Sequence, residues 1–209
     1  MAGEQTISDF LEALGSSAPA PGGGAASALA GALAAALAEM VAQLTVGRPR
    51  FATVEDPMRT LIAAARAARA ELLALAEDDA RAYAVVSAAY KLPKATGDEK
   101  TYRDAVIQST LHAAMQPPLR MMAVGCRVLS LAEEAAASGN PTVASDAGCA
   151  ALLGEAAVRA AGLNVLANVV LLRDEVAATE ARAAKARYEE EAAALRERTM
   201  AAVHARMGG

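Results

Sequence analysis

The 209-residue chain has few aromatic residues and no excess of positive charge. Aromatic side chains make up 3% of the sequence, and tryptophan is absent. A protein that binds nucleic acid by stacking bases needs such rings. The net charge of −4 also argues against this class, because neutralising phosphates takes an excess of lysine and arginine. The composition therefore predicts no nucleic-acid partner.

Cysteine and histidine are also scarce. The two cysteines, Cys126 and Cys149, lie far apart without metal-ligand spacing, and His112 and His204 are the only histidines. The sequence contains no HExxH motif, no paired CxxC motifs and no phosphate-binding lysine loop. We therefore expect reduced, structural cysteines in a cytoplasmic protein, and a reaction that uses no metal or other cofactor.

Charged residues are missing between Glu12 and Glu39, over a length that would span a bilayer. Pro19, Pro21 and three glycines interrupt this span, and most of the rest is alanine, which inserts weakly. No basic residue precedes it, so it does not resemble a signal peptide. We interpret it as a tightly packed internal helix and expect no membrane partner.

Alanine makes up more than a quarter of the residues, and strand patterns are almost absent. Proline and glycine divide the helical stretches, which we place at about 6–15, 25–46, 56–91, 96–138 with a break or kink at Pro117-Pro118, 145–172 and 174–207. The sequence predicts an all-α fold, with one domain over residues 1–209. Its architecture should be an up-and-down bundle of about five to six helices.

Small residues fill the segment from Ala25 to Ala38. Such residues let helix backbones approach closely, as they do in a bundle core or at a subunit interface. We expect this helix to form the interface of a homodimer.

A glycine-rich stretch, residues 17–24, runs directly into this helix and contains Pro21, Gly22, Gly23 and Gly24. Glycines leave backbone N–H groups exposed, and the start of a helix attracts anionic or carbonyl groups. The stretch is either a ligand-binding loop or a plain connection.

Asp79 and Tyr83 are four residues apart on one helix face, and Tyr90 follows on nearly the same side. This face can bind a flat ring and accept a proton, although Asp79 also belongs to a run of acidic residues typical of a solvated surface. Lys94 and Arg103 flank the next helix start, where they can meet a ligand carboxylate or lie on the surface.

Two further polar groups have alternative interpretations. Asn140, Ser145 and Asp146 stand where one helix ends and another begins, so capping explains all three. Asp146 nevertheless has apolar neighbours in sequence, which favours a raised pKa and acid–base work. Asn164 and Asn168 share one face of an apolar helix, where they either bond another helix or bind a ligand.

These stretches together resemble the cyclodeaminase/cyclohydrolase family of folate enzymes. The matching segments are Pro19 to Gly24, Leu44 to Gly47, Asp79 to Tyr83, Leu92 to Lys94, Glu99 to Arg103, Gly139-Asn140, Ser145-Asp146, Asn164 with Asn168, and Asp174. The resemblance implies an all-helical dimer whose substrate is a tetrahydrofolate derivative. It favours formimidoyltetrahydrofolate cyclodeaminase, with methenyltetrahydrofolate cyclohydrolase as the alternative. A non-catalytic folate-binding dimer is the alternative from another class.

Both reactions pass through a tetrahedral carbon between two nitrogens and require proton transfer. We assign this to Asp79 or Asp146, with Lys94 as a further candidate. Lys94 and Arg103 are candidates for binding the glutamate tail. The glycine loop should hold the ligand through its N–H groups. Asn164 and Asn168 should bind the pterin amide edge, and Tyr83 and Tyr90 should cover the ring.

Overall fold

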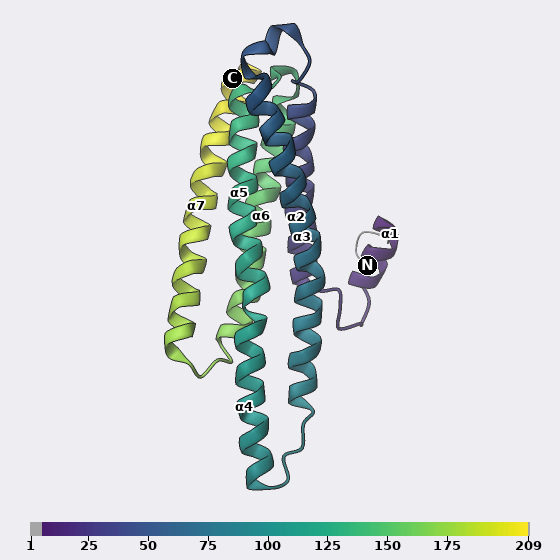
Figure 1. Cartoon of the computed structure of the whole chain (residues 1–209), viewed down its shortest axis with the longest axis vertical. Helices are drawn as coiled ribbons and strands as arrows, with labels where there is room; N and C mark the ends of the chain where they lie inside the picture. Colours follow the sequence, from purple (N-terminus) through teal and green to yellow (C-terminus); the bar gives the residue numbers. More distant parts are fainter. Residues whose placement is uncertain (1–5, 209) are drawn as a thin grey trace.

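The computed structural model describes residues 6–208, and this part of the chain is a helical bundle without strands (Figure 1). Its α-helices are α1 Ile7–Leu14, α2 Gly23–Gln43, α3 Glu55–Tyr90, α4 Gly97–Ala114, α5 Gln116–Ser138, α6 Ala144–Val169 and α7 Glu175–Met207. Two short 3-10 helices, η1 Pro49–Val54 and η2 Pro141–Val143, precede α3 and α6. The predicted all-α class is confirmed.

Local sequence patterns set most helix ends. Thr96 and Glu99 cap α4 reciprocally, because the Glu99 N–H donates to Thr96 Oγ1 and Glu99 Oε2 accepts from the Thr96 N–H. Pro117 and Pro118 lie in the first turn of α5. Proline lacks an N–H, and N–H groups in the first turn make no intrahelical hydrogen bond, so the helix loses none. The break or kink expected at Pro117-Pro118 is therefore a junction at Met115 between two helices.

Helix α2 lies inside the bundle and packs against α3, α5 and α6. Its small residues allow this close packing: a Cβ on Gly31 would lie 3.0 Å from Leu72 Cδ1 of α3. Most small side chains between Ala25 and Ala38 are buried within the chain. They build the core of one chain, whereas Leu33 of the same helix is 48% exposed.

Two helical stretches are long and apolar enough to span a membrane, namely α2 and residues 141–169. Other parts of the bundle bury 61% of the α2 window and 44% of the second window. This burial is what the core helices of a bundle require, as predicted for α2.

Three carboxylates each bridge two arginines and tie neighbouring helices together. Glu39 of α2 accepts hydrogen bonds from Arg66 Nε at 2.7 Å and Arg69 Nη1 at 2.8 Å, both on α3. Burial alone would raise the pKa of Glu39, but the two guanidinium groups lower it below its ordinary value. The other two bridges join Glu71 to Arg120 and Arg127, and Glu155 to Arg159 and Arg196.

Two parts of the chain reach beyond the bundle (Figure 1). Helix α1 stands to one side and has no buried residue, although half-buried Phe10 packs against the core. The end of α3 and the start of α4 form a hairpin that extends past the other helices. Within residues 77–106, Ala89 alone is buried.

Candidate active site

A cavity of about 410 Å³ opens where the α3–α4 hairpin leaves the bundle. Its volume lies in the range typical of small-molecule sites. Positions 79, 83, 86 and 90 of α3 line one wall because they share a helix face. The lining residues are Asp79, Ala82, Tyr83, Val86, Ser87 and Tyr90 from α3, Leu111 and Ala114 from α4, and Ala167, Asn168 and Leu171 from α6 and the residues after it.

Asp79 is the acidic residue of this wall. Its carboxyl lies against the first turn of α2, where a Cβ on Gly24 would come within 1.9 Å of Asp79 Oδ2. Burial raises the pKa of Asp79 above its ordinary value of 3.8. Among the described residues, no group donates a hydrogen bond to this carboxyl. It is therefore available to a ligand and able to exchange a proton with it.

The glycine stretch meets the asparagine pair beside Asp79. Gly22 and Gly23 are exposed at the start of α2, and a Cβ on Gly23 would lie 3.5 Å from Asn164 Oδ1. Pro21, which precedes them, is half-buried. The structure therefore brings together three motifs that the sequence analysis treated separately.

The two asparagines use their amide N–H groups mainly within the protein. Asn164 Nδ2 donates to the Ala160 carbonyl at 3.0 Å. Asn168 Nδ2 donates to the carbonyls of Asn164 at 3.0 Å and Ala114 at 3.3 Å. Their Oδ1 atoms accept no hydrogen bond from the described residues. They are left to accept from a ligand, and Asn164 keeps one N–H to donate.

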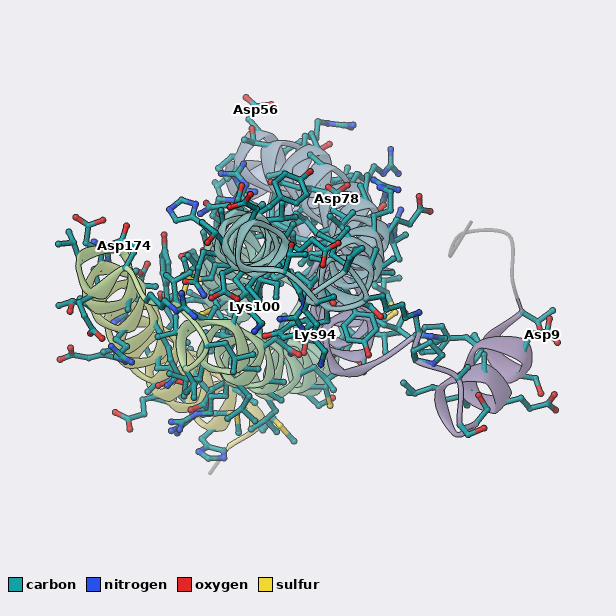
Figure 2. The ribbon with its side chains drawn as sticks, turned by 90° about the horizontal axis from the view of Figure 1, so that it is seen from below. Asp9, Asp56, Asp78, Lys94, Lys100 and Asp174 are labelled. Carbon is teal, nitrogen blue, oxygen red and sulfur yellow. The ribbon has the colours of Figure 1, made fainter. Side chains whose placement is uncertain are left out.

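Tyr83 and Tyr90 cover the outer part of the cavity and are 51% and 42% exposed. Arg103 of α4 supports Tyr90: its Nη2 donates to the Tyr90 carbonyl at 3.1 Å, and its guanidinium lies 5.6 Å from the ring centre. The Nε atom of Arg103 is buried without a hydrogen-bond partner. Lys94 is exposed in the connection from α3 to α4. Figure 2 shows Lys94 and Lys100 toward the middle of this end of the molecule, with Asp9 and Asp174 at its edges.

Asn140, Ser145 and Asp146 are not brought to this cavity within the chain. A rise of about 1.5 Å per residue puts Asp146 about 27 Å from Asn164 along α6. Ser145 and Asp146 lie in the first turn of α6, but the expectation that they cap this helix is wrong: its N-cap residue is Val143, which makes no side-chain capping bond.

Asn140 is 3% exposed and has structural partners. Its backbone N–H donates to Thr45 Oγ1 at 2.8 Å, and its Nδ2 donates to the Leu44 carbonyl at 3.2 Å. Its Oδ1 accepts from Arg50 Nη2 at 3.0 Å. These bonds tie the turn between α5 and α6 to the segment after α2. Asn140 also caps η2, because its Oδ1 accepts from the Thr142 N–H at 3.2 Å, so structural roles account for this residue.

Ser87 is a polar lining residue that the sequence analysis missed. It lies four residues after Tyr83, so the periodicity that joined Asp79 to Tyr83 would also have found it. The cavity is also lined by Leu111, Ala114 and Leu171, which belong to no sequence motif that would have predicted this position.

The fold and the cavity define a class of all-helical proteins with a pocket of small-molecule size between helices and with a carboxyl at that pocket that has no partner among the described residues. A sequence profile of the formiminotransferase-cyclodeaminase family matches residues 6–187, and the chain belongs to this family.

Individual relatives carry the names of two different enzymes, a cyclohydrolase and a cyclodeaminase. The chain is 41% identical over 180 residues to a methenyltetrahydrofolate cyclohydrolase of Methylorubrum extorquens, with 86% of each chain covered. It is 35% identical to the formimidoyltransferase-cyclodeaminase of Rattus norvegicus. That match covers 83% of this chain and 33% of the longer rat protein. The crystal structure of formiminotetrahydrofolate cyclodeaminase from Thermotoga maritima matches 98% of both chains at 28% identity, with a TM-score of 0.88.

Proposed function

We propose that the cavity binds a tetrahydrofolate whose one-carbon unit lies between two nitrogens, and that Asp79 moves the proton in the reaction at that carbon. The observation that carries the proposal is the carboxyl of Asp79, half-buried at the cavity and unpaired within the described residues. A carboxyl with a raised pKa suits general acid–base catalysis near neutral pH.

Methenyltetrahydrofolate is the substrate of the cyclohydrolase reaction and the product of the cyclodeaminase reaction. In cyclohydrolysis, water attacks the methenyl carbon and gives one proton to Asp79. The C–N bond then breaks as the leaving nitrogen takes this proton from Asp79, and the hydroxyl on the tetrahedral carbon loses its proton to solvent, which leaves formyltetrahydrofolate. The relative of similar length at 41% identity supports this reaction.

In cyclodeamination, the bridge nitrogen attacks the formimino carbon, and ammonia leaves after it receives a proton. The rat relative and the Thermotoga structure support this reaction. The same carboxyl serves either reaction, because each needs one proton removed from a nucleophile and one delivered to a leaving nitrogen.

Other residues that line the cavity or lie near it bind the substrate. The free Oδ1 atoms of Asn164 and Asn168 accept hydrogen bonds from the N–H groups of the pterin. Tyr83 and Tyr90 stack on its rings at the exposed side. Arg103 and Lys94 attract the glutamate carboxylates at the hairpin.

One spectrophotometric experiment tests the proposal. The protein is mixed separately with formimidoyltetrahydrofolate and with methenyltetrahydrofolate, and the methenyl absorbance is followed. A rise with the first substrate indicates cyclodeamination, and an accelerated fall with the second indicates cyclohydrolysis. If folate binds in a titration but neither absorbance changes, the protein is the non-catalytic binder and the proposed reaction is wrong.

We also propose that the chain forms a homodimer through the outer side of α2. Glu39 is the one charged residue of this helix, and it bonds inward to Arg66 and Arg69. The outer side therefore carries no free charge, and it exposes Leu33 and Met40 at 48% and 37%, with the polar Gln43 at its end. An uncharged surface of this kind on a long helix favours contact with a second copy.

A further inference from the structure

The three consecutive glycines before and within α2 have different surroundings. A Cβ on Gly22 would meet nothing within 4 Å, and one on Gly23 would make ordinary contact with Asn164 at 3.5 Å. A Cβ on Gly24 would lie 1.9 Å from Asp79 Oδ2, 2.4 Å from Cγ and 2.9 Å from Oδ1. The whole carboxyl group of Asp79 therefore occupies the place of a side chain at position 24.

We infer that Gly24 is a positioning residue for Asp79: its missing side chain makes the space that holds the carboxyl at the start of α2. This inference rests on the proposed function for its catalytic consequence. It also changes the role expected for the glycine stretch. Gly22 and Gly23 remain exposed to a ligand, whereas Gly24 contacts a carboxyl of the protein itself.

The first turn of α2 stabilises the Asp79 carboxylate in this position. Gly22 provides no side-chain cap, and no acidic residue lies in the first turn. The Ala26 N–H bonds back to the Gly22 carbonyl at 3.1 Å, so the N–H groups before it have no partner within the helix. These groups carry partial positive charge that favours an ionised carboxylate.

Apolar surroundings act on Asp79 in the opposite direction, because burial favours the neutral acid. The titratable groups of the cavity wall are Tyr83 and Tyr90 on α3, with Arg103 of α4 beside Tyr90. The start of α2 carries no titratable side chain, and α6 contributes amides. The helix start and the apolar wall thus oppose each other at one carboxyl, which lets it take up and release a proton.

Glycine at position 24 is unfavourable for the helix itself. Alanine is the better helix former, and the three heavy atoms nearest to the added methyl group all belong to the Asp79 carboxyl. Activity and stability should therefore respond differently to Gly24→Ala. The methyl group displaces the carboxyl while the helix gains propensity.

The experiment compares Gly24→Ala with the matched control Gly148→Ala, which adds the same methyl group inside α6, where it would make ordinary contact with Met200 and Val203 at 3.6 Å. For each variant we would measure kcat, KM, the melting temperature and the ¹³C-detected titration of the Asp79 carboxyl, which is assigned by its absence in Asp79→Asn. Gly24→Ala should lower kcat by about 10-fold to 100-fold, with KM changed less than threefold. Its Asp79 titration should shift, and its melting temperature should stay equal or rise. Gly148→Ala should keep kcat within about threefold and leave the titration unchanged.

Unchanged kcat and titration in Gly24→Ala would overturn the inference. If Gly24→Ala fails to fold, the double variant Gly24→Ala/Asp79→Ala decides, because removal of the carboxyl should restore folding. A double variant that still fails to fold overturns the inference. A wild-type protein without turnover on either folate would refute the proposed function alone, since the titration of the unliganded variants still tests the role of Gly24.

Discussion

Asp79 and Asp146 are the two carboxyls that the sequence offers for proton transfer, and their positions make them a matched pair. Replacing Asp79 by Asn keeps the shape but removes the proton acceptor, so we expect turnover to fall by about 10²–10⁴-fold. Asp146→Asn is the control, because it changes a residue in the first turn of α6 at the far end of the bundle. Steady-state rates with both folates measure the effect. Equal rates in the two variants would remove Asp79 from the mechanism.

Asp79→Asn should also change stability, with a sign set by the pKa. Burial raises the pKa of Asp79 in the folded protein above 3.8, so the folded state binds more protons than the unfolded state between these two values. Stability therefore falls as the pH rises through this interval, and the loss persists at neutral pH. Asn carries no such cost, and the carboxyl has no hydrogen bond to lose.

We consequently expect Asp79→Asn to melt at the same or a higher temperature than wild type at pH 7. The advantage should shrink as the pH approaches 4. Thermal melts followed by circular dichroism at both pH values provide the test. A lower melting temperature at pH 7 would mean that the carboxyl stabilises the fold and is not held there for catalysis.

At the scale of helices, the sequence predicted most boundaries because the residues that set them act locally. Thr96 caps α4 and the Pro117-Pro118 pair opens α5, whatever the rest of the chain does. The orientation of α2 could not be predicted in this way. Alanine and glycine occur on all its sides, so the buried side depends on contacts such as that of Gly31 with Leu72.

The same reasoning explains what was predicted of the site. Periodicity along α3 joined Asp79, Tyr83 and Tyr90, and all three line the cavity. The choice between Asp79 and Asp146 was open, because Asp79 belongs to an acidic run typical of a solvated surface and Asp146 stands where a helix cap would explain it. Only the packing of α3 and α6 shows which carboxyl lies at the cavity.

The outer side of α2 gives a test at this scale. Leu33→Glu places a charge on the proposed dimer contact, and it should convert the protein from a dimer to a chain of 21.2 kDa. Size-exclusion chromatography with light scattering at micromolar concentration measures the mass. Val176→Glu, at a 70% exposed position of α7, is the control and should not change it. A monomeric wild type would refute the proposed dimer.

The molecule as a whole combines a rigid body with a thin extension. Buried residues and the Glu–Arg bridges join α2, α3, α5, α6 and α7 along much of their length. The hairpin of α3 and α4 has little of this support, yet it supplies Asp79, Tyr83 and Tyr90 to the cavity wall.

This contrast has a consequence for amide hydrogen exchange. Segments with few buried contacts open without unfolding the rest, so amides in residues 80–106 should exchange about 10²-fold or more faster than those in the centres of α2 and α6. A folate bound against Tyr83 and Tyr90 has to be released before the hairpin can open, and its presence should slow exchange in this segment alone. Mass spectrometry of the exchanged protein with and without folate would show this as local protection. Uniform protection over the whole bundle would mean that the hairpin opens only together with the core.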